Sequence, residues 1–291
     1  MNKNISINIG FVILHYMTEK DSDRAIESII DNIDVDNYHI VVVDNASLND
    51  SAEYLRKKYD KNKKITVIKN KKNLGFANGN NIGIDYLNSN FDVDFICCLN
   101  NDVQLLEKNL FSKVQEEFLR SNFSLLGPLI LSGDGRYDSN PQRYSNLTNI
   151  SSINKAIRRY KEILILNKFN LYWLYSILKI FKDKRNSLQK KPIAPLRELN
   201  VQLSGACLIF SKNYFTKFKG FFDKTFLYKE EDIMYYLLKS NSLVSVFSPN
   251  IIVYHMEDSS TNSVIKSNKK KIDFVYRNYI RSLEEFKKIM K

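Results

Sequence analysis

Apolar and amphipathic segments alternate along the first hundred residues of this chain. Four continuous apolar runs, rich in β-branched residues, have the length of buried strands, and the stretches between them have helical periodicity. In the first of these stretches isoleucine recurs at positions 26, 29, 30 and 33, which is the spacing of one helix face. The pattern predicts strands at residues 5–14, 39–43, 65–68 and 94–99, and helices after residue 21 and at residues 51–59 and 77–87.

This alternation predicts an α/β fold with a Rossmann-like, mostly parallel sheet. Continuous hydrophobicity within each strand, with helices between the strands, is typical of a sheet covered by helices on both faces. Such sheets bind ligands just beyond the carboxyl ends of their strands. The polar segments 15–18, 44–47 and 100–102 are therefore expected to line one crevice.

The second half of the chain is less regular. Its pattern predicts a helix at residues 229–239 and strands at the four ranges 125–131, 202–210, 243–247 and 251–254, the last two separated by Pro249. The stretch from 155 to 191 contains eleven basic and two acidic residues, so it has nine of the chain's twelve net positive charges. A basic helical insertion is expected there.

Composition narrows the classes of protein that this chain can be. With 44% hydrophobic residues, global disorder is excluded. A net charge of +12 favours anionic partners, namely nucleic acid, phosphates or an acidic membrane surface. Three cysteines are too few for a disulfide framework or a four-cysteine zinc site, which favours a reduced, intracellular compartment. The first ten residues do not resemble an export signal, and the uncharged stretch 169–178 is too short to cross a bilayer.

Carboxylates mark three candidate sites. Asp44 follows a strand, where it could accept hydrogen bonds from a base or a ribose, or form an ordinary turn. Asp102 also follows a strand, where it could hold a divalent cation against a diphosphate, or cap a helix. Residues 230–232 are three consecutive acids among aromatic side chains, which favours a general base over a simple acidic helix start.

Two further features could take part in binding. Residues 73–83 place three glycines four apart where a loop leads into a helix, so backbone N–H groups there could face a nucleotide. The spacing matches neither a dinucleotide-binding fingerprint nor a P-loop, and by itself it favours a structural helix start over a nucleotide contact. His255 follows the last predicted strand, where it is either a structural histidine or a metal ligand beside Asp102.

Taken in order, these motifs resemble the inverting glycosyltransferases of family 2, which have the GT-A fold, and in particular their bacterial rhamnosyltransferase-like members. The family's first strand ends in a T-Y-N-like triplet, which is His15-Tyr16-Met17 here. The other motifs are V-V-V-D-N-x-S at 41–47, N-x-G-F-A-x-x-x-N at 73–81, L-N-x-D at 99–102, S-G-A with a strand at 204–210, G-F-F-D-x-x-F-x-Y-x-E-E-D at 220–232 and V-Y-H at 253–255.

The resemblance implies a role for each matching residue. Asp102 and His255 would bind the cation, Mn²⁺ or Mg²⁺, with Asn100 in place of the first acid of the family's D-x-D motif. The base would be Glu231 or Asp232, since the alignment of the acidic run is ambiguous by one residue. The nucleotide sugar would contact His15, Tyr16, Asp44, Asn45, Asn73, Gly75, Phe76, Asn81, Asn100, Asn101 and Gly205.

The resemblance also implies the domain organisation and the reaction. Residues 1–257 would form the GT-A domain, with a nucleotide-binding half at 1–110 and an acceptor half at 111–257 that includes the insertion at 150–197. Residues 258–291 would form a basic helical tail. A sugar would pass from a UDP- or dTDP-sugar to a hydroxyl of a saccharide or lipid-linked acceptor in bacterial surface polysaccharide synthesis.

Other interpretations stay open from the sequence alone. A sugar nucleotidyltransferase would share this architecture. Enzymes that resemble that class have a glycine-rich, arginine-containing loop after the first strand, and residues 15–19 lack this pattern. A non-enzymatic binder of anionic surfaces would explain the charge, although no nucleic-acid-binding motif is present and we expect no nucleic-acid partner. Around Trp173, the basic stretch predicts an anionic membrane as partner, or helices packed on the core at a homodimer contact. The expected location is cytoplasmic, or peripheral on the inner face of the cell membrane.

Overall fold

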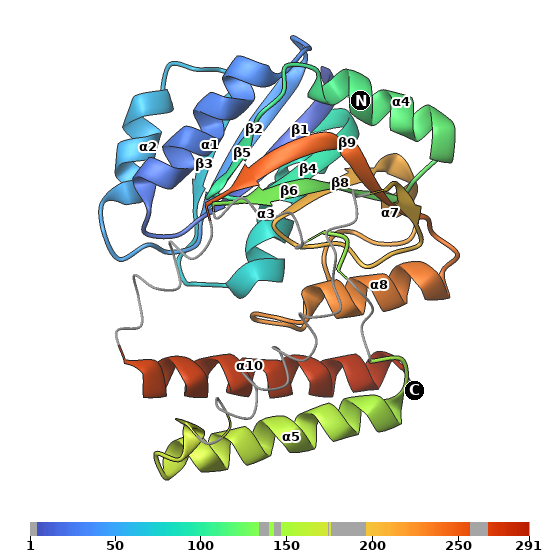
Figure 1. Ribbon diagram of the computed structural model, residues 1–291. Coiled ribbons are helices and arrows are strands. Elements are labelled where there is room, and N and C mark those ends of the chain that lie inside the picture. Colours follow the sequence, from blue (N-terminus) through green and yellow to red (C-terminus); the bar gives the residue numbers. More distant parts are fainter. Residues whose placement is uncertain are drawn as a thin grey trace.

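A computed structural model describes residues 5–133, 140–142, 147–173, 175, 196–256 and 267–290. Within these ranges, nine strands form one mixed sheet in the order β3-β2-β1-β4-β8-β6-β9-β5, and β7 pairs with β9 (Figure 1). The strands are β1 (Ile5–His15), β2 (Tyr38–Asp44), β3 (Ile65–Lys69), β4 (Phe91–Asn100), β5 (Val103–Leu105), β6 (Leu125–Ser132), β7 (Glu198–Leu199), β8 (Cys207–Ser211) and β9 (Ser245–His255).

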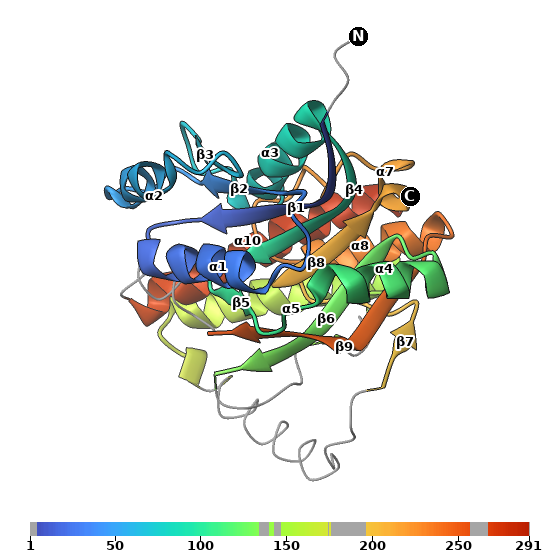
Figure 2. The same cartoon turned by 90° about the horizontal axis from the view of Figure 1, so that it is seen from above.

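Helices cover both faces of this sheet, as the sequence predicts (Figure 2). One face packs against α1, α2 and α4, and the other against α3 and α8. The helices are α1 (Glu19–Asn32), α2 (Ser51–Tyr59), α3 (Gly75–Asn90), α4 (Leu110–Ser121), α5 (Ile150–Lys168), α7 (Lys212–Phe215), α8 (Glu230–Ser240) and α10 (Asn268–Ile289).

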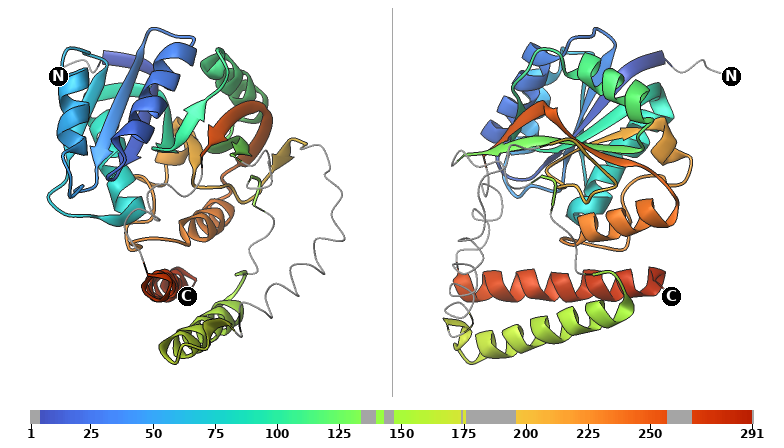
Figure 3. Two further views of the ribbon diagram at one scale, coloured as in Figure 1. Left: turned by 60° about the vertical axis from the view of Figure 1, so that its left-hand side comes forward. Right: turned by 45° about the vertical axis from the view of Figure 1, so that its right-hand side comes forward.

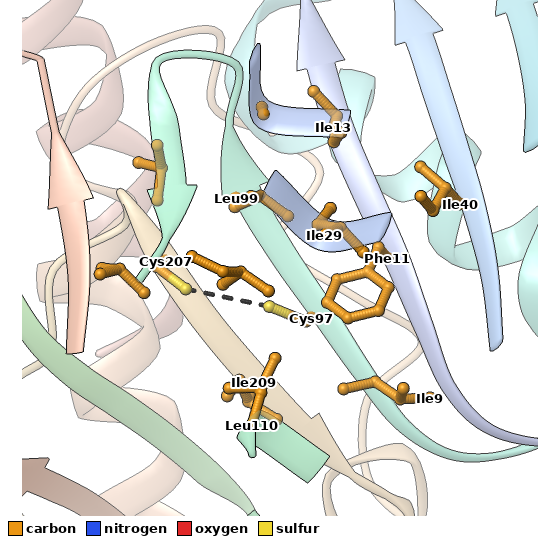
Figure 4. Close-up of a cluster of buried hydrophobic side chains, with 14 of the residues drawn as sticks. Ile9, Phe11, Ile13, Ile29, Ile40, Cys97, Leu99, Leu110, Cys207 and Ile209 are labelled. Carbon is orange, nitrogen blue, oxygen red and sulfur yellow. Dashed lines mark hydrogen bonds between the residues drawn. The ribbon is translucent and has the colours of Figure 1, made fainter. Parts of the chain in front are cut away.

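The core lies on both sides of the parallel strands because alternate side chains of each buried strand point to opposite faces. In β1, Phe11 and Ile13 pack under α1, whereas Val12 packs under α3. Figure 4 shows the first of these clusters, in which the Sγ atoms of the free cysteines Cys97 and Cys207 lie 3.8 Å apart. Burial of this alternating apolar surface is the main force that holds the helices to the sheet.

A third layer consists of α5 and α10, which pack side by side on the outer side of α8 (Figure 3). Their contact with α8 is apolar: Ile153 and Ile157 of α5 and Leu283 and Phe286 of α10 surround Ile233. The basic insertion and the C-terminal segment, which are far apart in the sequence, therefore meet in one helical pair. In the described residues, no helix has the length and hydrophobicity needed to span a bilayer.

The structure differs from the sequence prediction at several elements. The strands expected on either side of Pro249 are one strand, β9, whose pairing with β6 shifts register between Pro128 and Leu129. A bulge of this kind accommodates a proline, which has no N–H to donate. The strand expected at 202–210 starts only at Cys207. Both β5 and α4 have no counterpart in the prediction; β5 is only three residues long, too short for a periodic pattern.

Candidate active site

The polar residues that follow β1, β2 and β4 meet at one edge of the sheet. In the parallel pairing His15 lies opposite Asp44, and Leu14 lies opposite Asn100. The carboxyl ends of these three strands are therefore aligned, and the three segments expected to share a crevice do lie together.

Asp44 has an unsatisfied carboxylate oxygen at this edge. The side chain is fully buried, and its Oδ1 accepts a hydrogen bond from the backbone N–H of Ser47 at 3.0 Å. Its Oδ2 has no hydrogen-bond partner among the described residues. A buried polar atom without a partner is costly, so this oxygen is suited to accept a hydrogen bond from a ligand.

His15, which is expected to contact the nucleotide sugar, forms hydrogen bonds within the protein. Its ring is fully buried, and its Nδ1 and Nε2 lie 2.6 Å from Ser22 Oγ and 2.8 Å from Ser51 Oγ. Burial lowers the pKa of this histidine, which favours the neutral ring. Because both nitrogens are occupied, His15 holds the starts of α1 and α2 beside the carboxyl end of β1. The next residue, Tyr16, is half-buried in the loop that follows β1.

The amide side chains expected to contact the nucleotide are bonded to the protein itself. Asn45 donates to Asn73 Oδ1 and to the Gly75 carbonyl, both at 3.0 Å, and accepts from the Leu74 N–H at 2.9 Å. This network fixes the loop before α3. At its end Gly75 has a φ of +79°, and a Cβ there would lie 1.9 Å from the Phe226 carbonyl oxygen. Only glycine fits this position.

Asn81 fastens the same helix to the second half of the chain. Its Oδ1 accepts from the Phe221 N–H at 2.8 Å, and its Nδ2 donates to the Phe221 carbonyl at 2.9 Å. The Phe76 N–H donates to the Phe226 carbonyl at 2.8 Å, and Asn78 donates to the Asp223 carbonyl at 2.9 Å. Residues of the 73–81 motif thus form hydrogen bonds with the segment 220–226, which is followed closely by the three acids at 230–232. The sequence analysis attributed no role to Asn78.

Asn100 and Asn101 also bond to neighbouring backbone and side chains. The Asn100 N–H donates to the Ala206 carbonyl at 2.9 Å, which joins the end of β4 to the segment before β8. The buried Asn101 amide donates to Thr18 Oγ1 at 2.7 Å and to Ser22 Oγ at 3.1 Å, so it positions the start of α1. These bonds occupy the side-chain N–H groups of Asn101, which is one of the residues expected to contact the nucleotide sugar.

Asp102 and His255 form the pair that the sequence analysis expects. Asp102 is buried, and its Oδ1 lies 3.2 Å from His255 Nε2. The pairing of β5 with β9 brings them together, because Val103 lies directly opposite His255. In the described residues no cluster of three or more histidine, cysteine or acidic side chains could hold a metal entirely by protein ligands. One carboxylate and one imidazole fit a cation that takes its other ligands from water and phosphate oxygens.

Three acids occupy the first turn of α8, each in a different environment. Asp232 is buried, and its Oδ2 lies 3.1 Å from Lys229 Nζ. Glu231 is half-buried, and its Oε1 accepts from the Gly205 N–H at 3.3 Å. Burial, and next the charge of Asp232, raise the pKa of Glu231. Burial, and next the charge of Glu231, raise the pKa of Glu230 to about 7.

The backbone before these acids is strained. Tyr228 and Lys229 have φ values of 70° and 72°, a region that residues with a Cβ rarely adopt and that costs about 1–3 kcal/mol each. Lys229 is held by its ion pair with Asp232 and lies 5.2 Å from the centre of the Tyr279 ring in α10. The sequence-based prediction gives no role to Lys229 or Tyr279; Lys229 is adjacent to the acids in the chain, whereas Tyr279 comes near them only because α10 packs beside α8.

Residues 204–206 connect the two parts of the site. The Gly205 N–H bonds to Glu231, and the next residue, Ala206, bonds through its carbonyl to Asn100. A Cβ on Gly205 would lie 3.1 Å from Glu231 Oε1 and 3.4 Å from the Phe76 ring, so a larger residue would crowd this junction. The acidic turn of α8 and the strand end before Asp102 are therefore held on either side of one short turn.

Comparisons with known proteins agree with this architecture. The sequence profile of glycosyl transferase family 2 matches residues 11–181. The 1–349 fragment of S. aureus TarS has a similar structure, with a TM-score of 0.54 at 11% identity, over 96% of this chain and 72% of that one. The same fragment solved with UDP matches equally well, over 94% and 71% of the two chains. No curated protein matches the sequence.

A longer TarS structure gives the same TM-score of 0.54 at 12% identity, and there this chain spans only 37% of the TarS chain. At such low identity the likeness to TarS establishes the fold, which is GT-A-like with a mixed sheet and a C-terminal helix. The family match does not single out its rhamnosyltransferase-like members. Because the family profile covers 171 of the 291 residues, this chain belongs to glycosyl transferase family 2.

Proposed function

We propose that this protein is an inverting glycosyltransferase that moves a sugar from a UDP- or dTDP-sugar to an acceptor hydroxyl. The observation that supports this most directly is the junction at residues 204–206, which holds Glu231 on one side and the strand end before Asp102 on the other. A base and a diphosphate-binding residue on opposite sides of one turn are what a single displacement at a sugar carbon requires.

The donor nucleotide would lie over the carboxyl ends of β1 and β2. Asp44 Oδ2 is buried without a partner in the described residues and would accept a hydrogen bond from a base N–H or a ribose hydroxyl. The crystal structure of the TarS fragment with UDP, a relative in fold, makes a uridine nucleotide the first donor to test. The loop at 70–75 would support the nucleotide through its backbone conformation, because its amide side chains are already hydrogen-bonded within the protein.

Glu231 is the base in this proposal. Asp232 forms an ion pair with Lys229, whereas Glu231 is half-buried, pairs with no described lysine or arginine, and accepts a long bond of 3.3 Å from the Gly205 N–H. Its raised pKa makes it a stronger base than an exposed glutamate. Glu231 accepts the proton of the acceptor hydroxyl while that oxygen forms a bond to the anomeric carbon. The bond from that carbon to the diphosphate breaks on the opposite face, which inverts the configuration.

Asp102 and His255 would hold a divalent cation, Mn²⁺ or Mg²⁺. When bound, such a cation stabilises the negative charge that develops on the departing diphosphate. Asn100 would contribute through its backbone, because its N–H is bonded to Ala206 and keeps this edge in place.

The acceptor is a hydroxyl of a saccharide or a lipid-linked saccharide, and the pathway is bacterial surface polysaccharide synthesis. In this proposal the protein works in the cytoplasm or at the inner face of the cell membrane. The sugar, the linkage and the acceptor depend on the acceptor half of the chain.

The proposal is tested by donor binding and turnover together. Thermal unfolding is followed with a panel of nucleotide sugars, each with and without Mn²⁺, since a ligand that binds the folded state raises its apparent stability. The best donor is then used to measure transfer, or hydrolysis of the donor when the acceptor is unknown. We expect Glu231→Gln to lower kcat by about 10² or more while donor binding is retained.

Asp232→Asn is the matched variant, because it removes the neighbouring charge and leaves Glu231 in place. A loss in kcat that is larger for Asp232→Asn than for Glu231→Gln would assign the base to Asp232. Stabilisation by no nucleotide sugar, with or without Mn²⁺, would refute the proposed function.

A further inference from the structure

Large apolar side chains are exposed together at the C-terminal end of α5. The exposed fractions are 56% for Ile165, 65% for Phe169, 39% for Leu171 and 54% for Trp173. Single exposed apolar residues are ordinary on protein surfaces, whereas four within nine residues concentrate exposed apolar surface at one helix end. Two of the four are aromatic, and Trp173 is the chain's only tryptophan.

The start of α10, which is rich in lysine, lies against the end of α5. Lys269, in the first turn of α10, donates to the Lys168 carbonyl at 3.0 Å and to Asn170 Oδ1 at 2.8 Å. These bonds fix the start of α10 against the end of α5. Lys270 and Lys271 follow directly, and Lys168, Lys269 and Lys270 are exposed. Phe169, Leu171 and Trp173, together with Lys168, Lys270 and Lys271, are called the docking end below.

Helix stability does not account for the lysines of α10. They occupy the first turn of the helix, which contains no acidic residue. Positive charge at a helix N-terminus interacts unfavourably with the helix dipole. Their position is instead favourable for an external anionic surface, since Lys269 and Lys270 are exposed at the end of the helical pair where Phe169 and Trp173 are also exposed.

The docking end lies on the same side of the molecule as the candidate active site. In Figures 1 and 2, the end of α5 and the start of α10 are on the side toward which the arrowheads of β1 and β2 point. A flat surface that contacts the docking end would therefore approach the mouth of the crevice.

We propose that the docking end binds the surface of a bilayer that contains anionic phospholipid. Tryptophan and phenylalanine side chains partition into the headgroup region, and each nearby lysine adds favourable electrostatic energy. This attachment is peripheral, in keeping with the described helices, none of which could span a bilayer. The inference deepens the proposed function, on which it rests, because it would bring the crevice to acceptors carried on lipid.

The test is co-sedimentation of the full chain with vesicles of phosphatidylcholine alone and with vesicles that also contain phosphatidylglycerol. We expect binding only to the second kind, and less binding as salt rises. The triple variant Lys168→Gln, Lys270→Gln and Lys271→Gln should lower the partition coefficient at least about tenfold. The double variant Phe169→Ser and Trp173→Ser should lower it by a similar factor.

The control variants remove exposed lysines or exposed apolar side chains that lie outside the docking end. Lys217, Lys219 and Lys239 are exposed lysines near α7 and the end of α8, and their replacement by glutamine removes an equal charge. Leu119→Ser and Tyr54→Ser remove exposed apolar side chains from α4 and α2.

Each outcome supports or overturns the proposal. Retained binding in the controls and lost binding in the docking-end variants supports it. Equal binding to both kinds of vesicle, no binding to either, or equal loss in the lysine controls overturns it. Donor binding and donor hydrolysis need no membrane. A protein that hydrolyses the donor but does not bind vesicles would therefore refute this inference and leave the proposed function intact.

Discussion

The raised pKa of Glu230, in the first turn of α8, can be tested through its effect on stability. It is 6% exposed, and its Oε1 has no hydrogen-bond partner among the described residues. Burial, and next the negative charge of Glu231, raise its pKa from 4.5 to about 7. The folded protein therefore keeps a proton on Glu230 in a range of pH where the unfolded chain has lost it. Glutamine has the same shape and no charge, so Glu230→Gln removes this penalty.

The sign and size of the effect follow from proton linkage. Because the pKa of this acid is raised on folding, the free energy of unfolding falls as pH rises from about 4.5 to about 7. At 1.36 kcal/mol per pKa unit, the full penalty above pH 7 is about 3 kcal/mol. Loss of a favourable charge at the start of α8 offsets about 0.3–1 kcal/mol of the gain. We expect Glu230→Gln to be more stable than the parent by about 2–3 kcal/mol near pH 8, and by much less near pH 5.

Urea unfolding of parent and variant across this range measures the difference directly. Glu53→Gln is the control, since Glu53 is exposed and its hydrogen bond from Arg56 lowers its pKa. Its replacement should change stability slightly and with the opposite sign, because a lowered pKa contributes stability above the unfolded value. A stability gap for Glu230→Gln that is the same at about pH 5 and about pH 8 would refute the reasoning.

Two further predictions concern the cation site and the loop before α3. We expect Asp102→Asn to fold normally and to retain less than about a tenth of the parent kcat, measured by donor turnover; a smaller loss, below roughly 1.4 kcal/mol, would contradict its role as a cation ligand. We expect Gly75→Ala to lower the free energy of unfolding by about 2 kcal/mol or more, because its φ is +79° and the new Cβ would meet backbone. In urea unfolding, Gly133→Ala is the control, since its Cβ would meet only a side-chain hydroxyl and a distant carbonyl; equal losses in both variants would contradict the strain argument.

The periodicity of the sequence predicts the parallel half of the sheet well. The first four predicted strands correspond to β1, β2, β3 and β4, and α2 begins and ends where the pattern places it. These elements are long, continuously apolar or clearly amphipathic, so local pattern and tertiary burial favour the same structure. The second half is less predictable because its short strands, such as β5 and β7, exist only through pairing with β9.

The sequence by itself determined which polar residues follow the parallel strands, and so at which edge of the sheet the candidate site is expected. Only the tertiary structure decided what each of them does, because a side chain's role depends on whether its hydrogen-bonding atoms are already occupied. His15, Asn81 and Asn101 are bonded within the protein, whereas Asp44 has an oxygen without a partner among the described residues. The ion pair of Lys229 likewise separates Asp232 from Glu231. The bonds of Asn81 and Asn101, by contrast, join residues far apart in the chain. Such contacts leave no periodic trace in the sequence, since they form only when the helices and strands pack.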